Sequence, residues 1–248
     1  MIVYSNSCSP GLPGQGHKIY PEFVADAFGA ELVNGGMEGS TNRRIIRTAL
    51  RDLAELKNQH QDIIAVIGLT FLARAEIWQP WLPAMSNDGH FRSIEVDYKK
   101  IDWSIKGLID TIVPNIADLA DRRTKDYYQQ WLLHYHPEST VTDLLTDIIM
   151  FSGWAKSNNI RHVIFSNPDS FPNDSKVGYN SPFIQSLREA VEQNSNIINP
   201  WTTSCNGYLL PRGFKLKDSE TLRHHGHPDE AGHHAWANFL IERLQPNQ

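Results

Sequence analysis

Residues 62–70, "DIIAVIGLT", form the apolar run that most constrains the fold of this chain. A run of this length, bounded by polar residues, is typical of a central parallel strand that is buried on both faces. Shorter apolar runs alternate along the chain with segments whose apolar residues have helical spacing. The expected strands are residues 1–4, 30–34, 62–70, 162–168 and 196–200, and the expected helices are residues 19–28, 42–57, 141–157, 181–193 and 229–244.

This alternation predicts a flavodoxin-like three-layer α/β/α sandwich around a parallel sheet of about five strands. Ligands of such sheets bind at the edge formed by the carboxyl ends of the strands. Residues 72–138 interrupt the pattern and hold four of the seven tryptophans. We interpret this segment as a helical insertion over that edge, with helices near residues 103–121 and 124–134. The whole chain, residues 1–248, is then expected to be one domain.

Charge and composition argue against several kinds of partner. The chain has 23 Lys and Arg against 28 Asp and Glu, and no run of basic residues exceeds two. We therefore expect no nucleic-acid partner. No apolar stretch approaches the ~18 residues that cross a membrane, and no secretory signal is visible, so we expect a cytoplasmic protein without a membrane partner. Two cysteines, Cys8 and Cys205, do not make a disulfide framework.

The histidines are concentrated near the C-terminus, with five of them within residues 224–234. A zinc site built from His224, His225 and His227 is one interpretation, but neighbouring residues rarely converge on one ion and the chain has no His-Glu-x-x-His pattern. We expect no metal. His233 and His234 are adjacent in an expected helix, and we expect them to pack or to lie on the surface. A histidine near a serine and backbone N–H donors is the minimum for nucleophilic acyl transfer.

Four segments, taken in chain order, resemble the sequence blocks of the SGNH/GDSL hydrolase superfamily. The first block of that family is Gly-Asp-Ser-Leu-Ser/Thr-x-Gly, the second is Asn-x-x-x-x-Gly, the third is Gly-x-Asn-Asp, and the last is Asp-x-x-His-Pro before a helix. The matching segments are "SNSCSPG", "NGGMEG" with Asn34 and Gly39 in register, "AVIGLT", and "HHGHP" with His227 on the catalytic histidine. Small members of this kind also occur in bacteriophage genomes.

The resemblance implies a site at the carboxyl edge of the sheet. Ser7 matches the nucleophile, with Ser9 as the alternative register; His227 matches the general base, and His224 stands where its orienting partner is expected. Oxyanion donors would be the N–H groups of Ser7 and Gly39, together with Thr70, and Asn42 and Arg74 are candidates for substrate contact. The implied reaction is hydrolysis of an ester, such as an O-acetyl group on a carbohydrate, without a cofactor. Association with a virion or with further copies of the chain is also compatible with the resemblance.

Two departures from the family pattern leave a second hypothesis open. Thr70 replaces the oxyanion-hole asparagine, and His224 replaces the aspartate that orients the catalytic histidine. Losing one oxyanion donor typically costs ~10²- to 10³-fold in rate. The sequence therefore predicts either a divergent serine esterase or a catalytically degenerate SGNH-fold module with a binding or structural role, for example in a phage particle.

Overall fold

The computed structural model describes most of the chain. The described residues are 1–12, 16–70, 72, 74–78, 91–95, 130, 137–167, 181–214, 216–217 and 227–245. None of the helices in these ranges is long and apolar enough to cross a membrane.

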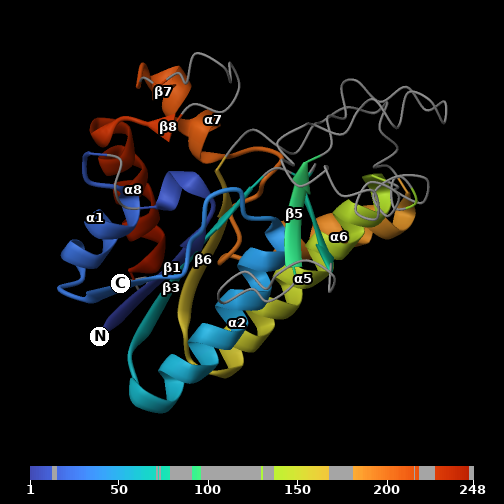
Figure 1. Ribbon diagram of the computed structural model, residues 1–248, viewed down its shortest axis with the longest axis horizontal. Helices are drawn as coiled ribbons and strands as arrows, with labels where there is room; N and C mark the ends of the chain where they lie inside the picture. The colour runs from blue at the N-terminus through green and yellow to red at the C-terminus, as the bar shows by residue number, and fades with distance from the viewer. Residues whose placement is uncertain are drawn as a thin grey trace.

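A parallel four-stranded sheet forms the centre of the molecule, in the order β2-β1-β3-β6 (Figure 1). The strands are β1 (Ile2–Ser7), β2 (Glu31–Asn34), β3 (Ile63–Leu69) and β6 (Arg161–Ser166). Every residue of β1 and β3 is buried, as their central position in the sheet requires. In this register Ser5 of β1 lies opposite Asn34 of β2, which places the ends of these two strands side by side.

Helices cover both faces of the sheet and make it the middle of three layers, which confirms the predicted fold class (Figure 1). One face packs against α2 (Asn42–Gln59), α5 (Pro137–Ser157) and α6 (Pro182–Glu192). The other face packs against α1 (Tyr20–Ala27) and α8 (Glu230–Leu244). Alternate residues of each strand enter the two cores, as the period of two in a β-strand dictates.

Side-chain caps fix where two helices near the carboxyl edge of the sheet begin. The hydroxyl of Thr41 accepts a hydrogen bond from the backbone N–H of Arg44 at the start of α2. The carboxylate of Asp229 accepts one from the N–H of Gly232 at the start of α8. Both caps satisfy N–H groups that have no partner within their own helix.

The Trp-rich middle of the chain differs from the prediction. Within it, β4 (Arg74–Trp78) pairs in antiparallel fashion with β5 (Phe91–Glu95), so a purely helical insertion was the wrong interpretation for these residues. The "RAEIW" segment alternates polar and apolar residues, a strand pattern that was overlooked. The helices expected at residues 103–121 and 124–134 fall, apart from Gln130, outside the described residues.

The remaining elements are short and lie around the carboxyl edge. They are the 3₁₀ helices η1 (Ser9–Gly11) and η6 (Leu210–Arg212), the helix α7 (Cys205–Leu209), and the antiparallel pair β7 (Leu216–Lys217) and β8 (His227–Pro228). Where a fifth strand was expected, Ile197 and Ser204 form isolated parallel bridges to β6. The ladder of the sheet therefore has four strands, with single bridges along the β6 edge.

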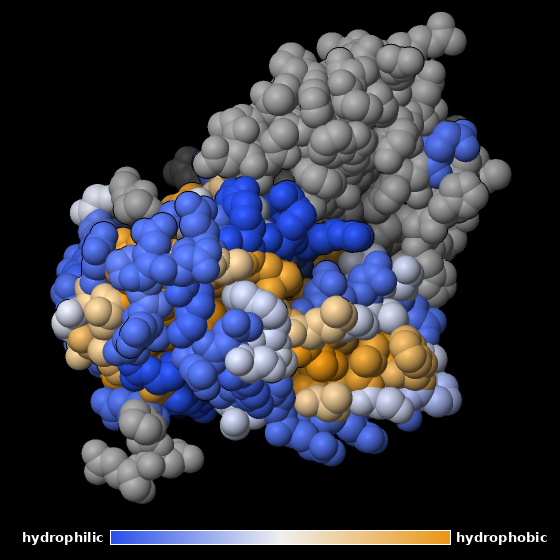
Figure 2. All heavy atoms as spheres, turned by 90° about the horizontal axis from the view of Figure 1, so that it is seen from below, coloured by the Kyte–Doolittle hydropathy of each residue, from blue (hydrophilic) through white to orange (hydrophobic). Residues whose placement is uncertain are grey.

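The surface facing the viewer in Figure 2 is mostly hydrophilic, with apolar side chains gathered toward the side where α5 and α6 lie. Met150 of α5 and Phe183 of α6 are exposed large hydrophobic residues. Scattered exposed apolar side chains are ordinary on soluble proteins, so these two carry no functional assignment.

A buried polar contact ties α5 to the start of β6. Nδ1 of His162 lies 3.0 Å from the carbonyl oxygen of Ile160, which can only accept, so Nδ1 carries the proton. Nε2 then accepts from the hydroxyl of Ser152 at 2.8 Å, and that hydroxyl accepts from Nδ2 of Asn194 at 2.9 Å. Burial lowers the pKa of His162, an effect that the bond to Ile160 opposes.

This lowered pKa predicts acid sensitivity. Below pH ~6.5 residue 162 becomes protonated in the unfolded chain but stays neutral in the folded chain. The free energy of unfolding should therefore decrease as the pH is lowered, until the pH falls below the pKa of the folded state. His162→Gln should remove that part of the pH dependence. Denaturant titrations of both proteins between pH 4.5 and 8 measure it. Parallel stability curves for the two proteins would contradict the assignment.

Candidate active site

The candidate site lies at the carboxyl edge of the sheet, where η1 lies against β8. Oγ of Ser9 is 2.9 Å from Nε2 of His227. Both residues are half-buried, so neither is sealed inside the core. A hydroxyl and an imidazole at this distance are the geometry of a nucleophile and its general base.

Ser9, the alternative register, therefore occupies the position that the sequence analysis gave to Ser7. Ser7 is the last residue of β1, is buried, and donates its hydroxyl hydrogen to the carbonyl of Cys8 at 2.8 Å. Side chains alternate along a strand, and Ser7 shares its face with Val3, which packs in the core under α1 and α8. A side chain reaches His227 only after the chain has left the strand and turned through η1.

Two glycines pack closely around Ser7. An added Cβ at Gly11 would overlap Oγ of Ser7 and lie 2.6 Å from the hydroxyl of Tyr20. An added Cβ at Gly68 of β3 would lie 2.9 Å from Cβ of Ser7 and 2.6 Å from Nδ2 of Asn167. Burial raises the pKa of Tyr20, and the nearby hydroxyl of Ser7 opposes that rise. The turn that carries Ser9 thus rests on a tightly filled layer.

The loop after β2 is attached directly to β1. The N–H of Gly35 donates to the carbonyl of Ser5 at 2.8 Å, and the N–H of Met37 donates to the carbonyl of Ser7 at 3.1 Å. Gly39 follows with a φ of +70°, a left-handed conformation that favours glycine, and an added Cβ there would meet nothing within 4 Å. Its N–H remains a predicted oxyanion donor.

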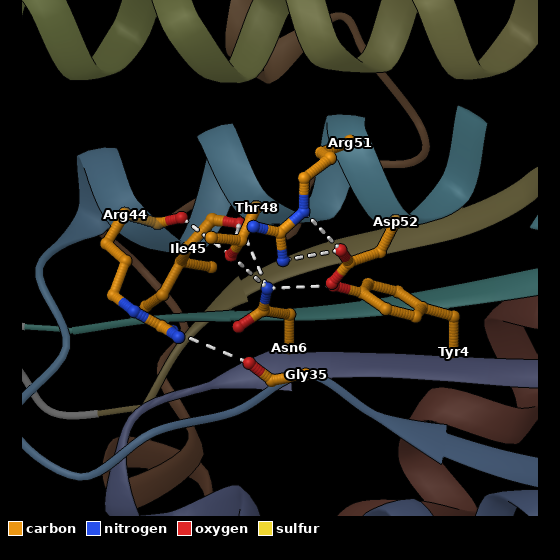
Figure 3. A network of polar contacts seen from close by, with 8 residues as sticks. All are labelled: Tyr4, Asn6, Gly35, Arg44, Ile45, Thr48, Arg51 and Asp52. Atoms are coloured by element: carbon orange, nitrogen blue, oxygen red, sulfur yellow. Dashed lines mark hydrogen bonds and ion pairs between the residues drawn. The ribbon is translucent and has the colours of Figure 1, made fainter. Parts of the chain in front are cut away.

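Arg44 of α2 forms hydrogen bonds to both ends of this loop, and Figure 3 shows the one to Gly35. Its Nη1 donates to the carbonyl of Gly35 at 3.4 Å and to the hydroxyl of Ser40 at 3.2 Å, and the side chain is buried. The neighbouring face of β1 is tied to α2 by Asn6, whose Nδ2 donates to the hydroxyls of Tyr4 and Thr48. The loop and the helix behind it are therefore held as one unit.

The next polar contact joins Asn42 to Thr70. The N–H of Thr70 donates to Oδ1 of Asn42 at 2.7 Å, and Nδ2 of Asn42 donates back to the carbonyl of Thr70 at 3.1 Å. Both residues are buried. The side-chain amide of Asn42 therefore joins the start of α2 to the residue after β3. Substrate contact by Asn42 and oxyanion binding by Thr70 stay predictions.

The other candidate residues are placed less completely. His224 and His225 lie outside the described residues, and Arg74 is the first residue of β4, so its contact with substrate stays a prediction. His233 is buried with its ring 5.4 Å from that of His17, and His234 lies on the surface with its ring 4.8 Å from that of Phe23. These placements confirm the expectation of packing and surface roles.

The described residues contain no group of three His, Cys, Asp or Glu side chains arranged to hold a metal ion. Sequence reasoning did not assign roles to Asn34, Arg44 or Tyr20, which shape the site. The signal available for Asn34 was its position, since it ends a strand and is followed by two glycines that let the backbone pass close to β1.

No family model and no curated protein matches this chain. Several solved structures are similar to it over nearly their whole length. An esterase from Pseudoalteromonas sp. is 14% identical, with 98% of this chain and 96% of that chain covered and a TM-score of 0.45. An acetylxylan esterase from Geobacillus stearothermophilus, solved as a catalytic mutant, is 12% identical, with 99% and 94% covered and a TM-score of 0.45.

A protein of the G-D-S-L family from Desulfitobacterium hafniense DCB-2 is 13% identical, with 98% of both chains covered and a TM-score of 0.42. The four sequence segments described above resemble the blocks of the family that this protein is named for. At these identities and TM-scores the likeness carries no argument about activity or substrate.

The close packing at Gly11 predicts that Gly11→Ala destabilises the protein by ~1–3 kcal/mol, because the ring of Tyr20 cannot retreat from the added methyl group. Gly153→Ala is a matched control. Gly153 is exposed within α5 and an added Cβ meets nothing within 4 Å, so this change should stabilise by ~0.5–1 kcal/mol. Denaturant unfolding measures both, and equal effects of the two changes would contradict the packing at Gly11.

Proposed function

We propose that this protein is a serine ester hydrolase in which Ser9 is the nucleophile and His227 is the general base. The observation that supports this most directly is the 2.9 Å separation of Oγ and Nε2. A second serine–histidine contact, Ser152 with His162, has a similar distance, but Ser152 is fully buried and cannot meet a substrate. Partial exposure therefore favours the Ser9 pair as the reactive one.

In the proposed reaction, Nε2 of His227 takes the hydroxyl proton while Oγ of Ser9 bonds to the ester carbonyl carbon. The carbonyl oxygen becomes an oxyanion, which the backbone N–H of Gly39 would stabilise. Thr70 is as fully buried as Ser152, so the proposed reaction does not use its hydroxyl. The bond to the alcohol then breaks, and the alcohol leaves with the proton from His227. Water gives a proton to His227 and attacks the acyl group, which releases the acid and restores Ser9. These steps need no cofactor.

The proposed substrate is an O-acetyl ester on a carbohydrate, an expectation that comes from the resemblance of the sequence blocks. The second candidate function is a degenerate module that binds a partner without turnover. Its support is the pair of departures at Thr70 and His224, together with the bonds that hold the backbone of Thr70 to Asn42. Activity measurements on matched variants separate the two candidates.

Covalent labelling tests the nucleophile. A serine-directed phosphonate should label the wild type at Ser9, since that hydroxyl is paired with the base. Ser9→Ala should abolish labelling and lower esterase turnover by at least ~10³-fold, the scale seen when a member of a serine site is removed. Ser7→Ala is the matched control, because it removes a hydroxyl two residues away that faces the core, and it should keep both. Labelling that survives in Ser9→Ala and is lost in Ser7→Ala would overturn the assignment.

The pH profile tests the base. His227 must be neutral to accept the proton, so turnover should rise with pH as its imidazolium loses its proton. His224→Asp restores the family pattern, and its carboxylate should stabilise the protonated ring of His227. We expect higher turnover and a midpoint at higher pH. If wild type and His224→Asp are both folded yet hydrolyse neither short p-nitrophenyl esters nor acetylated sugars, the binding module is the better account.

A further inference from the structure

One side chain touches both halves of the candidate site. Asn34 is the last residue of β2, and its Nδ2 donates a hydrogen bond to the carbonyl of Gly11 at 2.7 Å. Its Oδ1 accepts one from the N–H of Gly36 at 2.9 Å. Gly11 ends the 3₁₀ turn that begins with Ser9, and Gly36 begins the segment that leads to Gly39. The amide thus spans from the turn of the proposed nucleophile to the loop of the proposed oxyanion donor.

Two further observations show that this contact is closely fitted. Oδ1 of Asn34 would lie 2.9 Å from an added Cβ at Gly36, and Cδ2 of Leu12 and the carbonyl oxygen of Ser7 would each lie 3.1 Å from it. The turn also makes bonds within itself, from the N–H of Gly11 to the carbonyl of Cys8 and from the N–H of Leu12 to the carbonyl of Ser9. These bonds shape the turn but do not reach the loop.

We propose that Asn34 is a positioning residue that fixes the turn of Ser9 relative to the loop of Gly39. This inference rests on the proposed function and adds a residue to it. An oxyanion hole works only when its donors meet the position of the developing charge, and that position is set by where the nucleophile attacks. A displacement of ~1 Å between reacting groups can cost ~10²-fold in rate. Asn34 acts through backbone groups of both segments, so its loss should lower kcat while KM changes little.

The two bonds can be separated by substitution. Asn34→Asp keeps an acceptor for the N–H of Gly36 but loses the donor to Gly11, and its carboxylate repels that carbonyl. Asn34→Ala removes both bonds. The matched control is Asn158→Ala, because Nδ2 of Asn158 also donates to a backbone carbonyl, that of Trp154 at 2.8 Å, but next to the start of β6 at the opposite edge of the sheet.

With a short p-nitrophenyl ester as probe, both Asn34 variants should show kcat reduced ~10- to 100-fold and KM within ~3-fold of wild type. Asn158→Ala should keep the wild-type kcat even if it loses as much stability. A wild-type kcat in Asn34→Asp would overturn the proposal, since that variant lacks the bond to the turn of Ser9. An equal loss of kcat in Asn158→Ala would also overturn it, because the effect would then be general.

Amide hydrogen exchange gives a readout that needs no catalysis. In Asn34→Ala, exchange should quicken at Gly36 and in the turn at Gly11 and Leu12, whereas in Asn34→Asp it should quicken in the turn alone. Unchanged exchange in both segments would overturn the proposal. If the wild type has no turnover, the proposed function fails by that result, and exchange alone decides whether Asn34 couples the two segments.

Discussion

The position of β1 in the middle of the sheet is the constraint on which the site depends. β1 is paired on both sides, with β2 and β3, and all of its residues are buried. The turn of Ser9 continues directly from it, and the loop after β2 is bonded to the carbonyls of Ser5 and Ser7. Because one segment continues from this buried strand and the other is hydrogen-bonded to its backbone, β1 sets the separation of the two segments. Asn34 then joins the two segments beyond the end of the strand.

The parts of the fold that the sequence predicted well are those encoded locally. The apolar run at residues 62–70 and the amphipathic pattern at residues 42–57 correspond to β3 and α2, and Thr41 caps that helix. In these segments periodicity, capping and burial all indicate the same structure. The β4–β5 pair was not predicted, because the alternation of polar and apolar residues in "RAEIW" covers only four residues before Trp78 breaks it. An antiparallel pair whose strands are twelve residues apart leaves no turn signature as strong as a two-residue hairpin.

The sequence predicted which segments of the chain converge at the site, but not which of their side chains make contact. The order of the sequence blocks brought the first strand and His227 to one edge, and the structure places them there. Which of Ser7 and Ser9 lies against His227 depends on where β1 ends, and the ends of strands are the least reliable part of a prediction from sequence. A strand that continued to Ser9 would place Ser7 and Ser9 on the same face, whereas the 3₁₀ turn that begins at Ser9 turns its side chain toward His227. The roles of Asn34 and Arg44 depend on contacts between segments, which periodicity does not encode.

The histidine-rich segment serves several roles rather than one, which bears on how the proposed site would work. Of the histidines in this segment that the structure describes, His233 packs in the core, His234 lies on the surface, and His227 meets Ser9. As a base, His227 must accept at Nε2, so its proton belongs on Nδ1, and a group that accepts from Nδ1 holds that tautomer. If His224 orients His227, as the resemblance of the sequence blocks implies, its neutral imidazole would meet this requirement but would add no negative charge to stabilise the imidazolium. In a serine protease, an amide in place of the orienting carboxylate costs ~10⁴-fold because it favours the wrong tautomer. A partner that preserves the tautomer and lacks only the charge should therefore slow the reaction without changing its course.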